Sequence, residues 1–286
     1  MKLYLHRLSL TEREFQRDIF EYSEAEQLGE MPQAPTRLDW LFKLFGSEEA
    51  VVYYPKGHSG TEFRFICSQI EGDIIAGVIA KRKQAVGNFN IDNPLDQQTR
   101  EEWETCDLFL NLGDDEQVIG IEKNSRVASS PLKIISDLVE AVNEQNQGAY
   151  KIDVFPLHNE MSFWEAIERH GGKVTTLRVD LVVPNPEPSA STTAQEMEAL
   201  QNTMNLQKKT EIFQSEEGLV VDTPETRDKE KYVSRGHGSI TAKNGNDLVF
   251  SSEKSTTSED VSDEFRINID KKPTGLLARL SSILRR

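Results

Sequence analysis

Cysteine is almost absent from this chain, which contains only two, Cys67 and Cys106, among 286 residues. Neither belongs to a CxxC pair or lies near a group of histidines, so a disulfide framework is excluded and both thiols are expected to be small buried side chains. The five histidines lack the spacing of metal ligands, and each is expected at the surface or in a helix cap. The sequence therefore predicts no zinc centre.

Long hydrophobic runs are also missing. No stretch approaches the roughly 18 consecutive apolar residues of a membrane span. The opening run MKLYLHRLSL is interrupted by His6 and Arg7 and has no small-residue cleavage site, so we expect a first strand there rather than a signal peptide. The 37% hydrophobic content is enough for one sizeable core or two smaller ones. These features predict a cytoplasmic globular protein.

Basic residues are fewer than acidic ones: the chain has 33 lysines and arginines against 48 aspartates and glutamates, a formal net charge of −15. Proteins that follow a phosphate backbone normally carry a basic excess, so general nucleic-acid binding is not expected. The chain also has no Walker loop, dinucleotide fingerprint or zinc motif, and no cofactor is expected. GHSG (57–60) and RGHGS (235–239) are each one residue short of GxSxG, and turns are expected at both.

The stretch GDDEQVIGIEKNSRV, 113–127, has the composition of a nuclease metal site. Restriction-type nucleases hold a divalent cation with an aspartate at one strand end and a Glu-x-Lys pair on the next strand. Here Glu122 and Lys123 are adjacent, so they point to opposite faces of a strand. We therefore expect a strand–turn–strand hairpin with Asp114 and Asp115 in the turn. A degenerate metal site is the alternative.

A second candidate lies in EGDIIAGVIAKRK, 71–83. Asp73 and Lys81 share a strand face, but the second carboxylate that a metal site needs is missing. The pattern predicts a buried strand whose solvent end carries Lys81, Arg82 and Lys83. These three residues form the candidate nucleic-acid-binding site, which would make weak contacts with phosphate.

Helix and strand signals are clearest between 130 and 183. Ser130 followed by Pro131 is typical of a helix start, and apolar residues then recur at helical spacing until Gly148. YKIDVF, 150–155, predicts a strand. The S-x-x-E capping box of Ser162 and Glu165 predicts a short helix that two glycines at 171 and 172 end, and alternation up to residue 183 predicts a half-buried strand.

The C-terminal third begins with PNPEPSASTT, 184–193, which has the composition of a linker. A helix is expected over roughly 193–214, followed by a hairpin that turns at Asn244-Gly245. The polar, acidic stretch 251–264 is expected to be flexible. Five aliphatic residues near the C-terminus fall on one stripe of a helix too short to be stable alone in water, so this helix must dock.

The residues expected to bind a partner at this terminal helix are Leu276, Leu277, Arg279, Leu280, Ile283 and Leu284. Docking onto the protein's own body, onto a second subunit or partner, or onto an anionic membrane surface are all open.

Together these patterns predict an α+β protein. A mixed sheet with flanking helices is expected over 1–188, and a smaller C-terminal module of a helix and a hairpin over 189–250. A flexible acidic segment is expected over 251–272, and the terminal amphipathic docking helix over 273–286.

The order of these elements over 105–245 resembles the bacterial phage-defence proteins of the RexA and KwaB kind. The resemblance depends on this order and on three short pieces: GVIAKRK, FWEAIERHGGKVTTLRVDLVVPNP and YVSRGHGSI. It implies a non-enzymatic defence component that binds DNA or a phage product and acts through a partner, often one at the membrane. The charge of −15 departs from what a general DNA binder should show.

Three hypotheses follow. The first is a cytoplasmic sensor or binding component of an anti-phage system, with no catalytic residues, no metal ligands and a protein partner that is either a second copy or another defence component. Nucleic acid would be bound weakly, and a membrane only indirectly or through the terminal helix. The alternatives are a metal-dependent nuclease with a non-standard site and an acidic adaptor for protein interactions.

Overall fold

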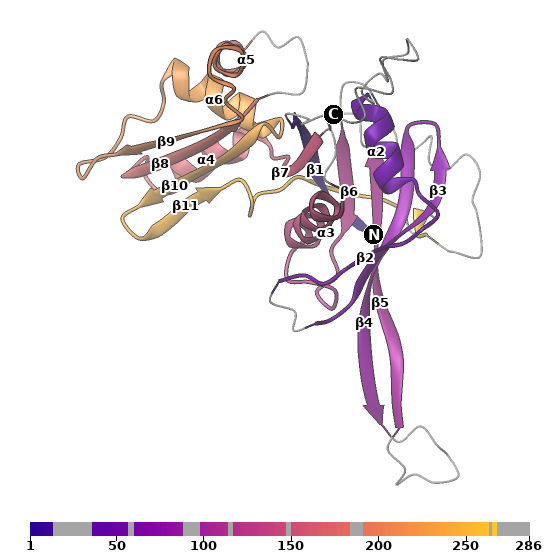
Figure 1. Ribbon diagram of the computed structural model, residues 1–286. Helices are drawn as coiled ribbons and strands as arrows, with labels where there is room; N and C mark the ends of the chain where they lie inside the picture. Colours follow the sequence, from indigo (N-terminus) through magenta and orange to yellow (C-terminus); the bar gives the residue numbers. More distant parts are fainter. Residues whose placement is uncertain are drawn as a thin grey trace, which may run out of the picture.

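The computed structural model describes most of the chain. The described residues are 1–13, 36–56, 60–87, 98–113, 117–146, 150–183, 191–262 and 265–267. The fold class is α+β, as predicted, and the strands form two separate antiparallel sheets. Figure 1 shows the larger sheet in purple and magenta, and a smaller lobe, mostly orange, beside it.

The larger sheet has the strand order β12-β1-β6-β5-β4-β3-β2, and β7 pairs with the remaining length of β1. The predicted first strand, β1, lies between β6 on one side and β12 and β7 on the other, and its Leu3, Leu5, Leu8 and Leu10 are buried. The strands are β1 (Lys2–Glu12), β2 (Val51–Tyr53), β3 (Phe63–Glu71), β4 (Ile74–Gly87), β5 (Gln98–Asn111), β6 (Val118–Glu122), β7 (Tyr150–Pro156) and β12 (Ser258–Asp260).

Two helices, α2 (Arg37–Phe45) and α3 (Pro131–Gln145), pack on this sheet. The predicted start of α3 is confirmed, because the Ser130 hydroxyl accepts a hydrogen bond from the Lys133 amide and Pro131 occupies the first turn. The aliphatic face of α3 joins the main core. Its polar end contacts edge strands on two sides: Asn143 binds the backbone of β7, and the Gln145 amide donates to the Val52 carbonyl of β2 at 2.7 Å.

The smaller lobe contains a four-stranded sheet in the order β11-β10-β8-β9, and three helices pack on one face of it. Leu177, Val179 and Leu181 of β8 point to these helices because alternate residues of a strand share a face. The elements are α4 (Glu160–Arg169), β8 (Thr176–Val182), α5 (Thr192–Met204), β9 (Lys208–Gln214), α6 (Pro224–Ser234), β10 (Gly238–Asn244) and β11 (Asp247–Ser251).

The strand pairings divide the chain earlier than the predicted boundary at residue 188. β8 precedes that boundary, yet it pairs with β9 and β10, which follow it. The lobes therefore change between β7 and α4. The predicted helix over 193–214 is wrong in its second half, because Asn205 adopts a left-handed conformation (φ 53°) that ends α5, and the alternating residues after it form β9.

Two details of α4 and the hairpin bear on the sequence motifs. The helix begins at Asn159, whose side chain accepts from the Met161 amide at 2.9 Å, so the predicted capping box of Ser162 and Glu165 is not the helix start. The glycines predicted to end it do so, with φ values of 70° and 74°. The predicted β10–β11 hairpin is confirmed, and Gly245 in its turn has a φ of 58°.

The described part of the acidic stretch after β11 is not the flexible segment expected. Its residues return to the large sheet as β12, which pairs with the start of β1, and the Thr257 amide donates to the Leu157 carbonyl at 2.6 Å. Val261 is buried against the same sheet. This return ties the small lobe back to the large one. The expected docking helix over 273–286, including all six of its partner-binding residues, lies outside the described residues.

Candidate functional site

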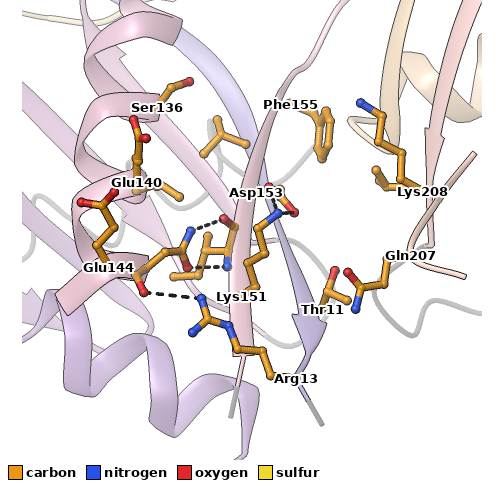
Figure 2. A pocket seen from close by; sticks show the side chains of 15 residues that line it. Thr11, Arg13, Ser136, Glu140, Glu144, Lys151, Asp153, Phe155, Gln207 and Lys208 are labelled. Carbon is orange, nitrogen blue, oxygen red and sulfur yellow. Dashed lines mark hydrogen bonds and ion pairs between the residues drawn. The ribbon is translucent and has the colours of Figure 1, made fainter. Parts of the chain in front are cut away.

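A groove of about 660 Å³ with polar walls lies between α3, β7 and the near end of the smaller lobe. Figure 2 shows α3 on one side of β7 and Lys208 on the other. The lining comes from the end of β1, from α3, from β7 and from the residues around the start of β9. Its labelled side chains are Thr11, Arg13, Ser136, Glu140, Glu144, Lys151, Asp153, Phe155, Gln207 and Lys208.

The floor of this groove is the outer edge of β7, and Asn143 caps that edge at one residue. Its amide nitrogen donates to the Ile152 carbonyl at 2.7 Å, and its amide oxygen accepts from the Ile152 N–H at 2.9 Å. The side chain therefore makes the two hydrogen bonds that a neighbouring strand would make. It follows that the Ile152 backbone groups face away from β1.

Val154 lies two residues further along the same edge. Because backbone groups on a strand alternate in direction, its N–H and C=O face the same way as those of Ile152, into the groove. Within the described part of the chain, neither group has a hydrogen-bond partner. Pro156, the next residue facing outward, has no N–H to offer. The open part of the edge is therefore centred on Val154.

The charges around the groove are balanced rather than of one sign. Lys151 pairs with Asp153 at 2.9 Å, and Glu140 pairs with Lys56 outside the groove at 2.5 Å. Lys208 lies 3.8 Å from Asp180, whose pKa is lowered despite its partial burial because Arg178 and Thr210 donate hydrogen bonds to its carboxylate. Such a lining suits a polypeptide better than a polyanion, which would need an excess of cations.

The structure brings the predicted phosphate-binding residues together at the solvent end of the buried part of β4. Each already has a partner: Lys81 donates to the Arg126 carbonyl at 3.0 Å, Arg82 pairs with Glu62 at 3.3 Å and with Glu101, and Lys83 pairs with Glu104 at 3.2 Å. A hydrogen bond from Arg64 also keeps the pKa of Glu62 below its ordinary value, so this carboxylate stays ionised beside Arg82. Phosphate would have to compete with these carboxylates.

The strand–turn–strand prediction for 113–127 is confirmed, since β5 and β6 pair antiparallel with Leu108 opposite Ile121. Glu122 accepts from Arg266 at 3.0 Å, and Lys123 lies over the Tyr4 ring. The turn residues Asp114 and Asp115 lie outside the described residues. Among the residues that the structure describes, no three His, Cys, Asp or Glu side chains are grouped to hold a metal ion.

Sequence reasoning missed a buried polar cluster where the lobes meet. His158 Nε2 lies 3.0 Å from Glu230 Oε1, with both side chains fully buried, and burial raises the pKa of Glu230. His6 and His237 are buried as well, so the expectation of surface or capping histidines is wrong for all three. It is right for His170, which forms the C-cap of α4. His158 and Glu230 are 72 residues apart in the sequence, so no local spacing pattern predicts that they are in contact.

The glycine motifs and the two cysteines have structural positions. Gly236 and Gly238 of RGHGS form the turn between α6 and β10, with φ values of 83° and 140°. Of GHSG, residues 57–59 lie outside the described part. Cys106 is buried and Cys67 half-buried, both as free thiols. None of the described helices is long and apolar enough to cross a membrane.

Comparison with known proteins adds no relative, because the chain matches no protein-family model and no curated protein sequence. The similarity in element order to the RexA and KwaB proteins therefore stays a prediction.

Proposed function

We propose that this protein is a non-enzymatic, cytoplasmic sensor component of a bacterial anti-phage system, and that it recognises an extended segment of a phage protein in the groove along β7. The observation that carries this proposal is the open strand edge at Val154, which faces a groove between the two lobes. The assignment to phage defence draws on the resemblance in element order. The signal would pass to a protein partner.

Strand addition fits the geometry of the groove. An extended segment beside β7 would pair with the Val154 N–H and C=O, and its side chains would point alternately to α3 and to the smaller lobe. Main-chain hydrogen bonds give affinity in this mode, while the walls select the side chains. Glu144 on one wall and Lys208 on the other favour a segment with charges of both signs.

A phage protein suits the described surface better than DNA. The cations of the solvent end of β4 are paired with carboxylates, and the whole chain carries a net charge of −15. Long-range electrostatics therefore oppose the approach of a phosphate backbone.

The test uses Val154→Pro, which removes the N–H that faces the groove and leaves the hydrogen bonds between β7 and β1 in place. Val154→Ala is the matched control, because it shortens the same side chain and keeps the N–H. Both are expressed with the genes that flank this one, and plating efficiency is measured for a panel of phages. We expect wild type and Val154→Ala to protect, and Val154→Pro to lose protection while the two variants melt within a few degrees of each other.

Two results would contradict the proposal. Protection by Val154→Pro equal to that of Val154→Ala would show that the edge has no role. Absence of protection by the wild type against every phage of the panel would remove the defence assignment. Incubating the purified chain with DNA and Mg²⁺ or Mn²⁺ tests the alternative of a metal-dependent nuclease, and cleavage that chelation abolishes would establish it instead.

A further inference from the structure

The distal half of the β4–β5 hairpin stands clear of the large sheet, as the long ribbon at the bottom of Figure 1. β3 pairs with β4 only as far as Lys81, and β6 pairs with β5 only from Leu108 onward. The two strands nevertheless continue to pair with each other as far as Gly87 and Gln98. We call residues 82–87 and 98–105 the arm.

Beyond Arg82 on β4 and before Thr105 on β5, the outward edges of the arm pair with no described strand. The Arg82 N–H donates to the Glu62 carbonyl at 2.8 Å, so its backbone faces away from β5, and Gln84, two residues further on, faces the same way. On the other strand, the Thr105 carbonyl accepts from Asn124 at 2.8 Å, so Trp103 and the alternate residues before it also face outward. No described strand pairs with either edge of the arm.

The two strands of the arm carry opposite charges. Arg82 and Lys83 lie on β4, whereas β5 carries Glu101, Glu102 and Glu104 beside a single cation, Arg100. The side chains of the Arg82–Glu101 pair are 36% and 55% exposed, and Lys83 is 54% exposed beside Glu104, which is 17% exposed. Exposed pairs of this kind contribute little to stability and re-form readily with new neighbours. The arm therefore offers one basic edge and one acidic edge.

We propose that the arm binds a second copy of this chain, with β4 of one copy adding to β5 of the next. Pairing β4 with β4, or β5 with β5, would place like charges opposite one another, which is unfavourable, whereas β4 beside β5 places cations opposite carboxylates. All arms then point the same way and every neighbouring pair is antiparallel. A contact between two different surfaces of this kind forms a ring where the rotation between neighbours closes, which leaves no edge unpaired, and an open filament where it does not.

Two further features support this occupant. An isolated two-stranded ribbon is marginally stable in water, and pairing with neighbouring arms supplies the third and fourth strands. Trp103 on the outward edge of β5 is 38% exposed and lies under the Arg64 guanidinium, 4.9 Å from the ring. Exposed tryptophan and arginine side chains are enriched in protein interfaces.

The experiment measures the mass of the full-length protein by light scattering after size exclusion, over a range of concentrations. We expect an assembly larger than a dimer. Gln84→Pro and Thr99→Pro each remove an outward N–H without disturbing the pairing between β4 and β5, and each should weaken assembly by roughly tenfold. Gln84→Ala and Thr99→Ala keep the N–H and should assemble like the wild type.

Charge reversal in trans separates assembly from the folding of each arm. The variant Arg82→Glu/Lys83→Glu has an acidic arm, and the variant Glu101→Lys/Glu102→Lys has a basic one. Each alone should be monomeric, and an equimolar mixture should assemble again. Pairing within one arm cannot produce this rescue, because in each variant the net charges of β4 and β5 have the same sign.

Three outcomes would overturn the proposal: a wild type that is monomeric at every concentration, a dimer that neither proline variant weakens, or reversed variants that stay apart when mixed. The arm lies outside the β7 groove, so this inference does not depend on the proposed function. Val154→Pro should assemble like the wild type, and the arm variants report assembly even if the groove binds nothing.

Discussion

The two halves of the β4–β5 hairpin have the same backbone pairing and very different surroundings. In the base, Ile75, Ile79, Cys106 and Leu108 are fully buried under the helices, and β3 and β6 flank the pair. In the arm the same two strands continue with charged side chains, and none of the described strands flanks them. Strand pairing therefore extends well beyond the core that stabilises it.

The length of these two strands is therefore not set by burial. The aliphatic run of β4 ends before Lys81, yet β4 continues to Gly87. A monomer gains little stability from such an extension, so its value lies in what it can bind. The following predictions compare the base with the arm, beginning with the largest effect.

Ile79→Ala should have the largest effect. Its side chain is fully buried in the main core between the sheet and the helices, and truncating a buried isoleucine leaves a cavity that costs about 3 kcal/mol. Gln84→Ala in the arm should cost less than about 0.5 kcal/mol, because it removes only exposed atoms. Urea unfolding followed by circular dichroism measures both, and equal losses would show that the arm is as much part of the folded core as the base.

Asp107→Asn should stabilise the protein in a pH-dependent way. Burial raises the pKa of Asp107 from 3.8 to about 6, although the Ile267 amide donates to its carboxylate. A raised carboxyl pKa means that the protonated form is favoured in the folded state, so its contribution is present below about pH 4 and lost as pH rises through about 6. Asparagine cannot ionise, and its advantage should grow to about 2 kcal/mol above that range.

Melting temperatures of both proteins between about pH 4 and pH 7.5 check this expectation. Asp247→Asn, at an exposed position of β11, is the control and should show no such trend. A constant difference between Asp107→Asn and wild type at all pH values would contradict it.

Much of this hairpin could be predicted from the sequence, because its signals are local. The buried strand ending at the 81–83 cations and the β5–β6 hairpin both follow from the strand pattern and the turn residues. The start of α3 was also predictable, since Ser130 and Pro131 act on the helix that they precede. These features need no knowledge of the rest of the chain.

The partners of those residues could not be predicted, because they come from distant segments. The carboxylates that neutralise the cations at the solvent end of β4 lie on β3 and β5, in a register that only the folded sheet defines. The sequence also could not show which sheet β8 joins, because the half-buried pattern of β8 fits a strand of either lobe. The open edge at Val154 depends on Asn143, which the sequence shows only as a polar residue on a helix.

Asn124→Ala should change the free energy of unfolding by less than Ile79→Ala or Asp107→Asn. Asn124 contacts β5 at Thr105, where the base of the hairpin meets the arm. Its side chain donates to the Thr105 carbonyl at 2.8 Å and accepts from the Arg126 amide at 3.0 Å. Losing these bonds in a half-exposed loop should cost about 1 kcal/mol. Hydrogen exchange should show faster exchange on the arm side of residue 105 and no change in the base. Faster exchange at Ile79 would mean that base and arm open as one unit.

The smallest effect is expected for the ion pair between Lys83 and Glu104, which are 3.2 Å apart with the lysine side chain 54% exposed. A double-mutant cycle with Lys83→Ala and Glu104→Ala should give a coupling energy of at most about 0.5 kcal/mol when arms are separate. Gln84→Pro supplies that background, because it removes the outward N–H through which a neighbouring arm would pair.

The same cycle without Gln84→Pro then tests whether the arm is a surface or an interface. If a second arm lies beside β4, Lys83 gains carboxylates from the neighbouring copy and loses exposure to water, so part of its interaction no longer depends on Glu104. Lys83→Ala alone should then reduce assembly while the pairwise coupling stays small. A coupling that is equal in both backgrounds, together with unchanged assembly in Lys83→Ala, would show that the arm is an ordinary solvated hairpin.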